Sequence, residues 1–439
     1  SEKYDTPVML RTTTRISHSR TVVELGEQKK TDPKGYQKNP SKYVMLPGFA
    51  RQRHPLVEKR LLALADEAEN SPFNRLETGT DNKIGIICSG IVYQYCKEAF
   101  PHIPVLKLGF TYPLPLKLID NFCRSVEKVF VIEELDPFLA ERIKAHGIRI
   151  TGQSLFSPVG ELRAEIIREK ISRFNNKVDS IESTDPNNST NPMEEKIPQR
   201  PPLLCPGCSH RGVFYALKQL KLRVAGDIGC YTLAALPPLK ALDSCICMGA
   251  SIGVALGMEK ANPKASSQTV AVIGDSTFFH SGITPLIDAV YNDSSITVII
   301  LDNSTTGMTG HQEHPGTGET LQGQTTKPVK IADLCQSLGV KRVVETDTSD
   351  LSTLREIIKT EVGCKELSVI IYRRPCILKS RTFAEPLRID PENCNGCKAC
   401  LQPGCPSISF KDGKALIDSR TCTGCDLCRQ LCKKNAIII

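Results

Sequence analysis

Short apolar runs alternate with amphipathic stretches through much of the chain. In the first half the predicted strands are 83–88, 105–108 and 128–134, and the predicted helices are 91–98, 116–126 and 138–146. Each of the three strand segments has the length and composition of a buried strand and is bounded by polar or turn residues. Strands that alternate with helices predict a parallel sheet with helices on its faces.

The second half repeats this organisation. Its predicted strands are 269–273, 296–301, 342–345 and 367–372. Between the first two, apolar residues recur at helical spacing, namely Ile283, Leu286, Ile287, Val290 and Tyr291. We therefore predict an α/β protein with two doubly wound parallel-sheet domains and a small α+β domain at its end.

The remaining segments are less regular. Residues 1–25 are predicted to form one strand and a turn, and a helix is predicted at 56–69. The segment 175–202 is rich in polar residues and proline and is predicted to be a linker, because it cannot bury much surface. The predicted segment boundaries are 1–30, 31–80, 81–174, 175–202, 203–384 and 385–439.

Composition narrows the class of protein. The 439 residues leave room for about three domains. No apolar run has the length of a membrane span and no signal-peptide pattern opens the chain, so we expect a cytoplasmic protein. The chain has no Trp and few aromatic residues, which argues against a nucleic-acid stacking surface. The net charge of +8 is spread along the chain and is interpreted as a solvated surface.

Cysteine usage points to metal chemistry. Eight of the 19 cysteines lie in two motifs, Cys394-x2-Cys397-x2-Cys400-x4-Cys405 and Cys422-x2-Cys425-x2-Cys428-x3-Cys432. Disulfides do not persist in a reducing cytosol, so clustered CxxC spacings there indicate metal ligands. A pair of zinc sites is the alternative, although zinc sites usually pair two CxxC units.

The two motifs resemble the bacterial ferredoxin module with two four-iron, four-sulfur (4Fe–4S) clusters, in which the fourth ligand of each cluster comes from the other motif. The chain departs from that module in two places. Four residues separate Cys400 from Cys405, where three are usual, and Lys433 stands where Pro is usual. Neither departure removes a ligand. The resemblance implies two ligand sets, Cys394, Cys397, Cys400 and Cys432 for one cluster and Cys422, Cys425, Cys428 and Cys405 for the other.

A second motif suggests a diphosphate site. Gly274, Asp275 and Ser276 follow a predicted strand, and after 26 further residues Asn303 follows the next. Backbone N–H groups at a helix start favour a diphosphate, and the carboxyl ends of parallel strands are where α/β folds bind ligands. The pattern is similar to the thiamine diphosphate motif. Asp275, Asn303 and the backbone carbonyl of Thr305 could then bind Mg²⁺ as oxygen ligands.

The small-residue turn at 249–253, which includes Gly249 and Ser251, has two interpretations. It could let the backbone approach the cofactor, or it could allow tight helix packing.

A third cysteine motif, Cys205-Pro206-Gly207-Cys208, opens the segment 203–384. CxxC alone could be a redox dithiol. Together with the diphosphate motif, however, it resembles the 2-oxoacid:ferredoxin oxidoreductase family, which holds a 4Fe–4S cluster near its cofactor. The resemblance implies that Gly229-Cys230 and Pro375-Cys376 supply the other two ligands. The alternative for Cys376 is an inert buried thiol.

The order of segments resembles the large subunits of the indolepyruvate-type members of that family. Their pattern runs from a pyrimidine domain through a transketolase C-terminal-like domain to a diphosphate domain and a ferredoxin domain. In this chain 1–30 resembles the end of the pyrimidine domain, most of which we expect to precede Ser1. The segment 81–174 resembles the transketolase C-terminal-like domain.

The resemblance implies an enzyme that oxidatively decarboxylates arylpyruvates with coenzyme A and passes electrons through three 4Fe–4S clusters to ferredoxin. Thiamine diphosphate and Mg²⁺ are the other expected cofactors, and a smaller subunit is the expected partner in a hetero-oligomer. His210, His311 and His314 are candidates for proton handling or ordinary structural histidines. The alternatives are an enzyme for pyruvate or branched-chain 2-oxoacids, and a non-catalytic electron-transfer subunit. Spacing alone does not separate the substrates.

Overall fold

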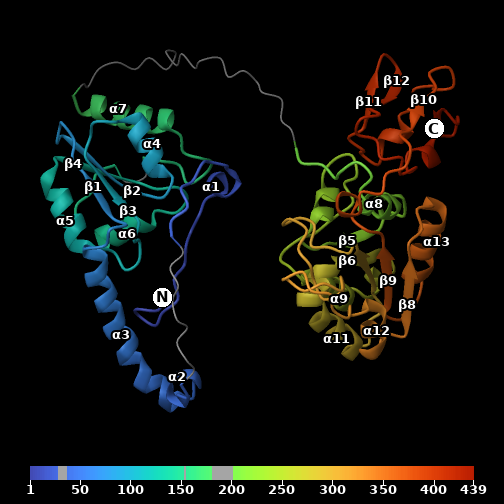
Figure 1. The fold of residues 1–439 in the computed structure, drawn as a ribbon, viewed down its shortest axis with the longest axis horizontal. Helices are drawn as coiled ribbons and strands as arrows, with labels where there is room; N and C mark the ends of the chain where they lie inside the picture. The colour runs from blue at the N-terminus through green and yellow to red at the C-terminus, as the bar shows by residue number, and fades with distance from the viewer. Residues whose placement is uncertain (28–36, 153–154, 180–200) are drawn as a thin grey trace. The chain divides into compact units, whose positions relative to one another are not determined.

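The computed structural model describes residues 1–27, 37–152, 155–179 and 201–439. The chain divides into two compact units, Ser1–Met193 and Glu194–Ile439 (Figure 1). Each unit has its own sheet and its own core. No helix within these described ranges is both long and apolar enough to cross a membrane.

The first unit is built on a four-stranded sheet of order β1-β3-β2-β4. The strands are β1 (Arg75–Glu77), β2 (Ile84–Ser89), β3 (Val105–Leu108) and β4 (Lys128–Ile132). The three predicted parallel strands are confirmed as β2, β3 and β4. The sequence analysis missed β1, an antiparallel edge strand that is too short to show a period.

Helices cover both faces of this sheet. They are α4 (Val92–Ala99), α5 (Leu116–Ser125), α6 (Phe138–Ala145) and α7 (Ala164–Asp179). One core joins the sheet to α4 and α7, and the other joins it to α5 and α6. The predicted linker 175–202 overlaps the end of α7, whose backbone remains helical to Asp179. Residues 180–200 of that predicted linker lie outside the described residues.

The N-terminal segment differs from its prediction. Its elements are α1 (Thr14–His18), α2 (Pro40–Tyr43) and α3 (Pro47–Glu69). The strand expected in 1–25 was wrong: the described residues 1–27 form no strand, and apolar Met9 and Leu10 are 93% and 87% exposed. An apolar run becomes a strand only where a neighbouring strand satisfies its backbone. The helix predicted at 56–69 is confirmed and begins earlier, at Pro47.

The second unit contains a fully parallel five-stranded sheet of order β5-β6-β7-β9-β8. Its strands are β5 (Arg223–Ala225), β6 (Thr269–Gly274), β7 (Thr297–Asp302), β8 (Arg342–Thr346) and β9 (Ser368–Arg373). The four predicted strands are confirmed, and β5 was missed because it has only three residues. Every residue of β6 and β7 is buried, as expected for central strands covered on both faces.

Alternate residues of these strands feed two cores. The helices α8 (His210–Gln219) and α13 (Leu351–Val362) pack on one face. The other face carries α9 (Ala250–Ala261), α11 (Ile283–Tyr291) and α12 (Ile331–Ser337). Shorter helical segments are η1 (Cys230–Ala235), η2 (Pro263–Gln268), α10 (Asp275–Thr277), η3 (Phe278–Gly282) and α14 (Ile377–Ser380).

The cysteine-rich tail, defined here as residues 385–439, contains two small antiparallel sheets. Strand β10 (Arg388–Ile389) pairs with β13 (Ile437–Ile438), and β11 (Ile408–Lys411) pairs with β12 (Lys414–Ile417). Two short helices, η4 (Ala399–Leu401) and η5 (Arg429–Leu431), complete it. The tail has a core of its own but belongs to the second unit, and the backbone N–H of Leu351 donates to Gln430 at 2.8 Å.

Candidate functional site

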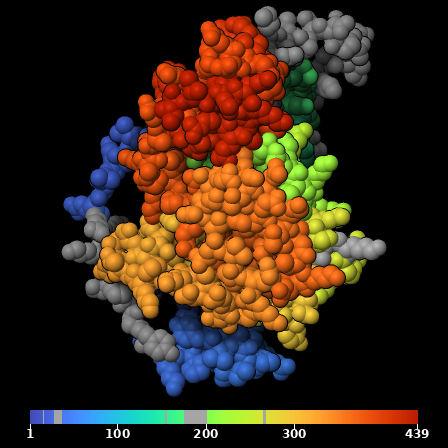
Figure 2. All heavy atoms as spheres, turned by 90° about the vertical axis from the view of Figure 1, so that its right-hand side faces the viewer, coloured from blue at the N-terminus to red at the C-terminus, as the bar shows by residue number. Residues whose placement is uncertain are grey.

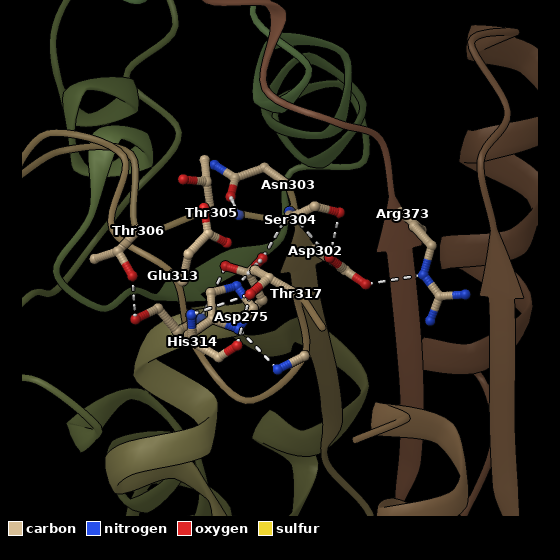
Figure 3. A network of polar contacts seen from close by, with 12 residues as sticks. Asp275, Asp302, Asn303, Ser304, Thr305, Thr306, Glu313, His314, Thr317 and Arg373 are labelled. Carbon is tan, nitrogen blue, oxygen red and sulfur yellow. Dashed lines mark hydrogen bonds and ion pairs between the residues drawn. The ribbon is translucent and has the colours of Figure 1, made fainter. Parts of the chain in front are cut away.

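The carboxyl ends of β6 and β7 bring the predicted diphosphate residues together. The two strands are adjacent and parallel, with Gly274 opposite Leu301. Asp275 therefore emerges beside the segment that begins at Asn303, although the two residues are far apart in sequence (Figure 3). Both are buried, with 3% of Asp275 and 8% of Asn303 exposed. The structure thus brings the predicted residues together at this sheet edge.

Asp275 is fixed by three hydrogen bonds. Its Oδ1 accepts from the backbone N–H of Ser276 at 2.8 Å, and its Oδ2 accepts from the backbone N–H of Ser304 at 2.8 Å. The Nε2 of His314 lies 3.1 Å from the same Oδ2 (Figure 3). Burial raises the pKa of the Asp275 carboxyl, and the His314 contact opposes that rise. The carboxylate is thus held rigidly at the strand end.

The tautomer of His314 follows from its two partners. Its Nδ1 accepts the backbone N–H of Gly316 at 3.1 Å, so the ring proton of the neutral form lies on Nε2 and is donated to Asp275. The sequence left His314 open between proton handling and a structural role. The structure places it against a candidate metal ligand, where it orients the carboxylate.

Asn303 and Thr305 form the opposite side of this site. The Oδ1 of Asn303 accepts the backbone N–H of Thr305 at 3.2 Å, and Thr305 is 1% exposed. Thr306 and Ser276 join the two strand ends through their hydroxyls at 2.8 Å. A carboxylate, an amide oxygen and a backbone carbonyl are hard oxygen donors, which suit Mg²⁺. The residues present fit that ion.

Asp227 is a buried carboxylate that sequence analysis missed. Its Oδ1 accepts the backbone N–H of Gly249 at 2.8 Å, and its Oδ2 accepts that of Ser251 at 3.1 Å. It therefore caps the start of α9 and fixes the small-residue turn. The only sequence signal was Gly226-Asp227 after β5, a strand too short to recognise.

The small-residue turn has a steric role as well. Gly249 has φ +88°, and a Cβ there would overlap Ser281, so tight packing accounts for the glycine. The Oγ of Ser251 is buried without a hydrogen-bond partner among the described residues. An unpaired buried hydroxyl is a group that a ligand could satisfy. The two interpretations of this turn are therefore compatible.

Four cysteines from distant segments meet beside this site. Cys205 and Cys208 precede α8, Cys230 begins η1, and Cys376 precedes α14. All four line one cavity of about 90 Å³, which Asn303 also lines. We call it the inner cysteine cavity. The backbone N–H of Cys376 donates to the carbonyl of Asn303 at 2.9 Å, which ties the fourth cysteine to the diphosphate side.

His210 and His311 line the inner cysteine cavity as well. His210 is 4% exposed, and neither of its ring nitrogens has a partner among the described residues. Burial lowers the pKa of His210 to about 4, so the ring is neutral near pH 7. The Nδ1 of His311 is also buried without a partner in the described part of the chain. Unpaired nitrogens in a cavity fit a bound group better than a closed core.

Tyr231 connects the inner cysteine cavity to the diphosphate turn. Its hydroxyl accepts the backbone N–H of Gly274 at 3.0 Å, and its ring stacks on Phe214 with centroids 6.3 Å apart. Burial raises the pKa of this phenol, so it remains protonated. The residue next to Cys230 thus reaches the start of the diphosphate motif. Sequence analysis gave Tyr231 no such role.

The eight tail cysteines line two further cavities. Cys394, Cys397, Cys400 and Cys432 line the outer cysteine cavity. Cys405, Cys422, Cys425 and Cys428 line the middle cysteine cavity. These are the two sets that the ferredoxin resemblance implied. Among the described residues no three His, Cys, Asp or Glu side chains are grouped to hold a single metal ion. A 4Fe–4S cubane binds each thiolate through a different iron, so a ring of four around a cavity fits a cluster.

One short loop separates two of these cavities. Cys205 and Cys208 line the inner cavity, while Pro206 and Gly207 between them line the middle one. Gly207 has φ +68°, and a Cβ there would overlap the Oγ1 of Thr423 in the tail. The loop can therefore approach the tail this closely only with glycine at position 207.

A buried arginine holds the same loop. Arg211 is 3% exposed, and its guanidinium donates to the carbonyl of Cys205 at 3.0 Å and to that of Pro403 at 2.7 Å. One side chain thus joins the loop to the tail, although Arg211 and Pro403 are 192 positions apart in the sequence. Sequence analysis did not assign Arg211 this role, because hydrogen bonds to carbonyls leave no spacing pattern.

We expect Gly207→Ala to weaken the contact between this loop and the tail. The added Cβ meets Thr423 and forces a left-handed backbone, at a cost of about 1–3 kcal/mol. Differential scanning calorimetry should show a transition of the second unit lowered by a few degrees. Thr423→Ala in the same background should restore part of the loss, because it removes the overlapping hydroxyl.

The matched control is Gly257→Ala in α9, where a Cβ has no neighbouring atom within 4 Å. That variant should retain or raise the transition temperature, because alanine favours a helix. Equal transition temperatures for the two variants would contradict the proposed close approach.

Comparisons with known proteins agree with this geometry. Residues 227–372 match the family described as "Thiamine pyrophosphate enzyme, C-terminal TPP binding domain". That match begins at Asp227 and contains Asp275, Asn303 and Thr305. The second unit therefore contains a thiamine diphosphate-binding domain.

Curated relatives extend the similarity over the chain. "Indolepyruvate oxidoreductase subunit IorA" of Pyrococcus horikoshii is 37% identical over 98% of this chain and 73% of its own length. The protein of the same name from Methanothermobacter marburgensis is 38% identical over all of this chain and 73% of its own.

Among solved structures, the 2-oxoglutarate:ferredoxin oxidoreductase from Magnetococcus marinus matches 41% of this chain and 66% of that chain. It has 20% identity and a TM-score of 0.35. A TM-score this low carries no conclusion about this chain.

Proposed function

Because the chain belongs to the family of the indolepyruvate oxidoreductase subunit IorA and is an oxidoreductase, we propose that it oxidatively decarboxylates arylpyruvates. In this proposal a 2-oxoacid, coenzyme A and two oxidised one-electron carriers give an acyl-CoA, CO₂, a proton and two reduced carriers. Ferredoxin is the proposed carrier, and a smaller subunit completes the enzyme. The names of the relatives support the arylpyruvate preference.

The inner cysteine cavity is the observation that carries the proposal. It places four thiols from three distant segments beside Asn303, a candidate ligand of the cofactor metal. Core cysteines that only pack would not need to share a cavity with unpaired histidine nitrogens. The alternative of a non-catalytic electron-transfer subunit is less well supported, because the buried Asp275 and Asn303 arrangement is intact.

The proposed cofactors are held by residues already described. Asp275, Asn303 and the carbonyl of Thr305 would bind Mg²⁺, and the turn at Gly274 would face the diphosphate. The three cysteine cavities would each hold one 4Fe–4S cluster. When bound, thiamine diphosphate supplies an electron sink for decarboxylation and the clusters supply one-electron acceptors.

The chain's own groups would prepare this site. His314 orients Asp275 through its Nε2 proton, and Asp227 fixes the turn that carries Ser251. His210 is neutral, so one of its ring nitrogens can accept a proton and the other can donate one. His210 and His311 are therefore the proposed proton-handling residues.

The direct test is a substrate panel with the complete enzyme, loaded anaerobically and assayed with its smaller subunit. Indolepyruvate, phenylpyruvate, pyruvate and a branched-chain 2-oxoacid should be compared for CoA-dependent ferredoxin reduction. We expect kcat/KM for the two arylpyruvates to exceed that for pyruvate by at least about 100-fold, since an aryl substituent offers side-chain contacts that a methyl group lacks. A preference for pyruvate or the branched-chain acid would contradict the proposed substrate.

We expect Asp275→Ala to abolish retention of thiamine diphosphate, because it removes the one charged oxygen ligand from the site. Cofactor retained after gel filtration should be measured together with iron content, which should stay unchanged. Asp288→Ala, at an exposed position on α11, is the control and should retain cofactor fully. Normal retention in Asp275→Ala would mean that this turn is an ordinary strand–helix connection.

We expect Cys376→Ser to remove one of three clusters. Iron and acid-labile sulfide should fall from about twelve to about eight of each per chain, because one corner of the inner set is lost. Ferredoxin reduction should collapse while slow, non-oxidative release of aldehyde continues. Cys364→Ser, outside all three cavities, is the control. A count of about twelve in Cys376→Ser would disprove this ligand assignment.

A further inference from the structure

The outer cysteine cavity is the part of the tail most accessible to a partner. Cys397 is exposed, whereas the other seven tail cysteines are buried or half-buried. The cavity lies against the surface strands β10 and β13, since Ile389 and Ile437 line it. Figure 2 shows the C-terminal residues, in red, at the surface of the second unit.

Lysines surround this cavity. Lys398 and Lys434 line it, and the Nζ of Lys414 donates to the carbonyl of Cys394. The Nζ of Lys398 lies 4.4 Å from the ring centre of Phe410, so a cation–π contact holds its ammonium beside that ring. Lys433, adjacent to Lys434, is exposed. We call Lys398, Lys433 and Lys434 the lysine rim.

None of the described ion pairs of the tail involves the lysine rim. Among the described residues that line the outer cavity, none is acidic. Elsewhere in the tail, Arg420 pairs with Asp418 at 3.0 Å and Arg429 with Asp426. The middle cavity, by contrast, is lined by Asp426 and by no lysine or arginine. Lysine side chains are therefore concentrated at one of the two tail cavities.

Apolar surface adjoins the rim. Ile438 and Ile439 follow the cavity-lining Ile437 and are 37% and 56% exposed. A protein–protein contact usually has an apolar centre and a polar rim. No tryptophan exists in the chain to stack on a nucleotide base. These features favour a protein partner of opposite charge.

Building on the proposed function, we infer that the lysine rim is the docking surface for an acidic one-electron carrier protein. Opposite charges raise the rate of encounter and orient the partner, and both effects weaken with salt. Docking there brings the carrier's redox centre to the exposed Cys397. Surface charges of the rim would act on association and not on the chemistry at the distant inner cavity.

The test is a charge reversal, Lys398→Glu, Lys433→Glu and Lys434→Glu combined, in the complete enzyme. The probe is an acidic two-cluster ferredoxin, and methyl viologen serves as a small acceptor. We expect KM for ferredoxin to rise by at least about tenfold at low salt, with kcat within about twofold and the difference shrinking at high salt. Viologen reduction should keep the parent rate.

Binding measured without turnover gives an independent readout. Calorimetric titration of ferredoxin into the substrate-free enzyme should show the same loss of affinity. The matched control reverses three other exposed lysines, Lys221→Glu, Lys359→Glu and Lys365→Glu, which alters net charge equally. It should leave binding within about twofold of the parent.

Unchanged ferredoxin KM and affinity in the rim variant would overturn the inference. Equal losses in the rim and control variants would also overturn it, since net charge alone would then explain binding. If the rim variant loses viologen reduction, the double variant Lys398→Gln and Lys434→Gln is used in place of the charge reversal. Its affinity for ferredoxin is measured by the same calorimetric titration. If the parent enzyme oxidises no 2-oxoacid, the proposed function fails, while the titration still decides the docking surface.

Discussion

The parallel pairing of β6, β7 and β9 is the constraint on which the candidate site depends. Register fixes where each strand ends, and all three strands end at the same edge of the sheet. Asp275 and Asn303 follow two of those ends directly, and Cys376 follows the third after two further residues. The hydrogen bond between Cys376 and the carbonyl of Asn303 extends this pairing beyond the last strand residues. Oxygen donors and thiols from separate segments are therefore positioned by backbone pairing.

Much of this organisation could be predicted from sequence because buried parallel strands are short apolar runs. The strands β6, β7, β8 and β9 were predicted for that reason, while β1 and β5 have three residues each and show no pattern. The strand expected in 1–25 was wrong because its apolar residues have no neighbouring strand. Hydrophobicity can be read from the sequence, but a strand also needs a neighbouring strand to pair with its backbone N–H and C=O groups.

The residues of the candidate site also fall into those that could be predicted from sequence and those that could not. The cysteines and the pair of Asp275 and Asn303 could be found because their chemistry demands residue types at fixed spacing. Asp227, Tyr231 and Arg211 could not, since each acts by hydrogen bonding to backbone groups, which any residue carries. His314 was found as a titratable residue, and its role was left open between proton handling and an ordinary structural one. Only its contact with Asp275 shows that it orients a carboxylate.

The loop of four residues between the inner and middle cysteine cavities limits how this protein can be divided into modules. The tail has its own core and resembles a self-contained fold. Yet one wall of its middle cavity, at Pro206 and Gly207, belongs to the neighbouring domain. A transplanted tail would leave that wall behind and admit solvent to four cysteines. An exchange of residues 385–439 between relatives would therefore preserve this cavity only where the loop 205–208 is compatible with the incoming tail.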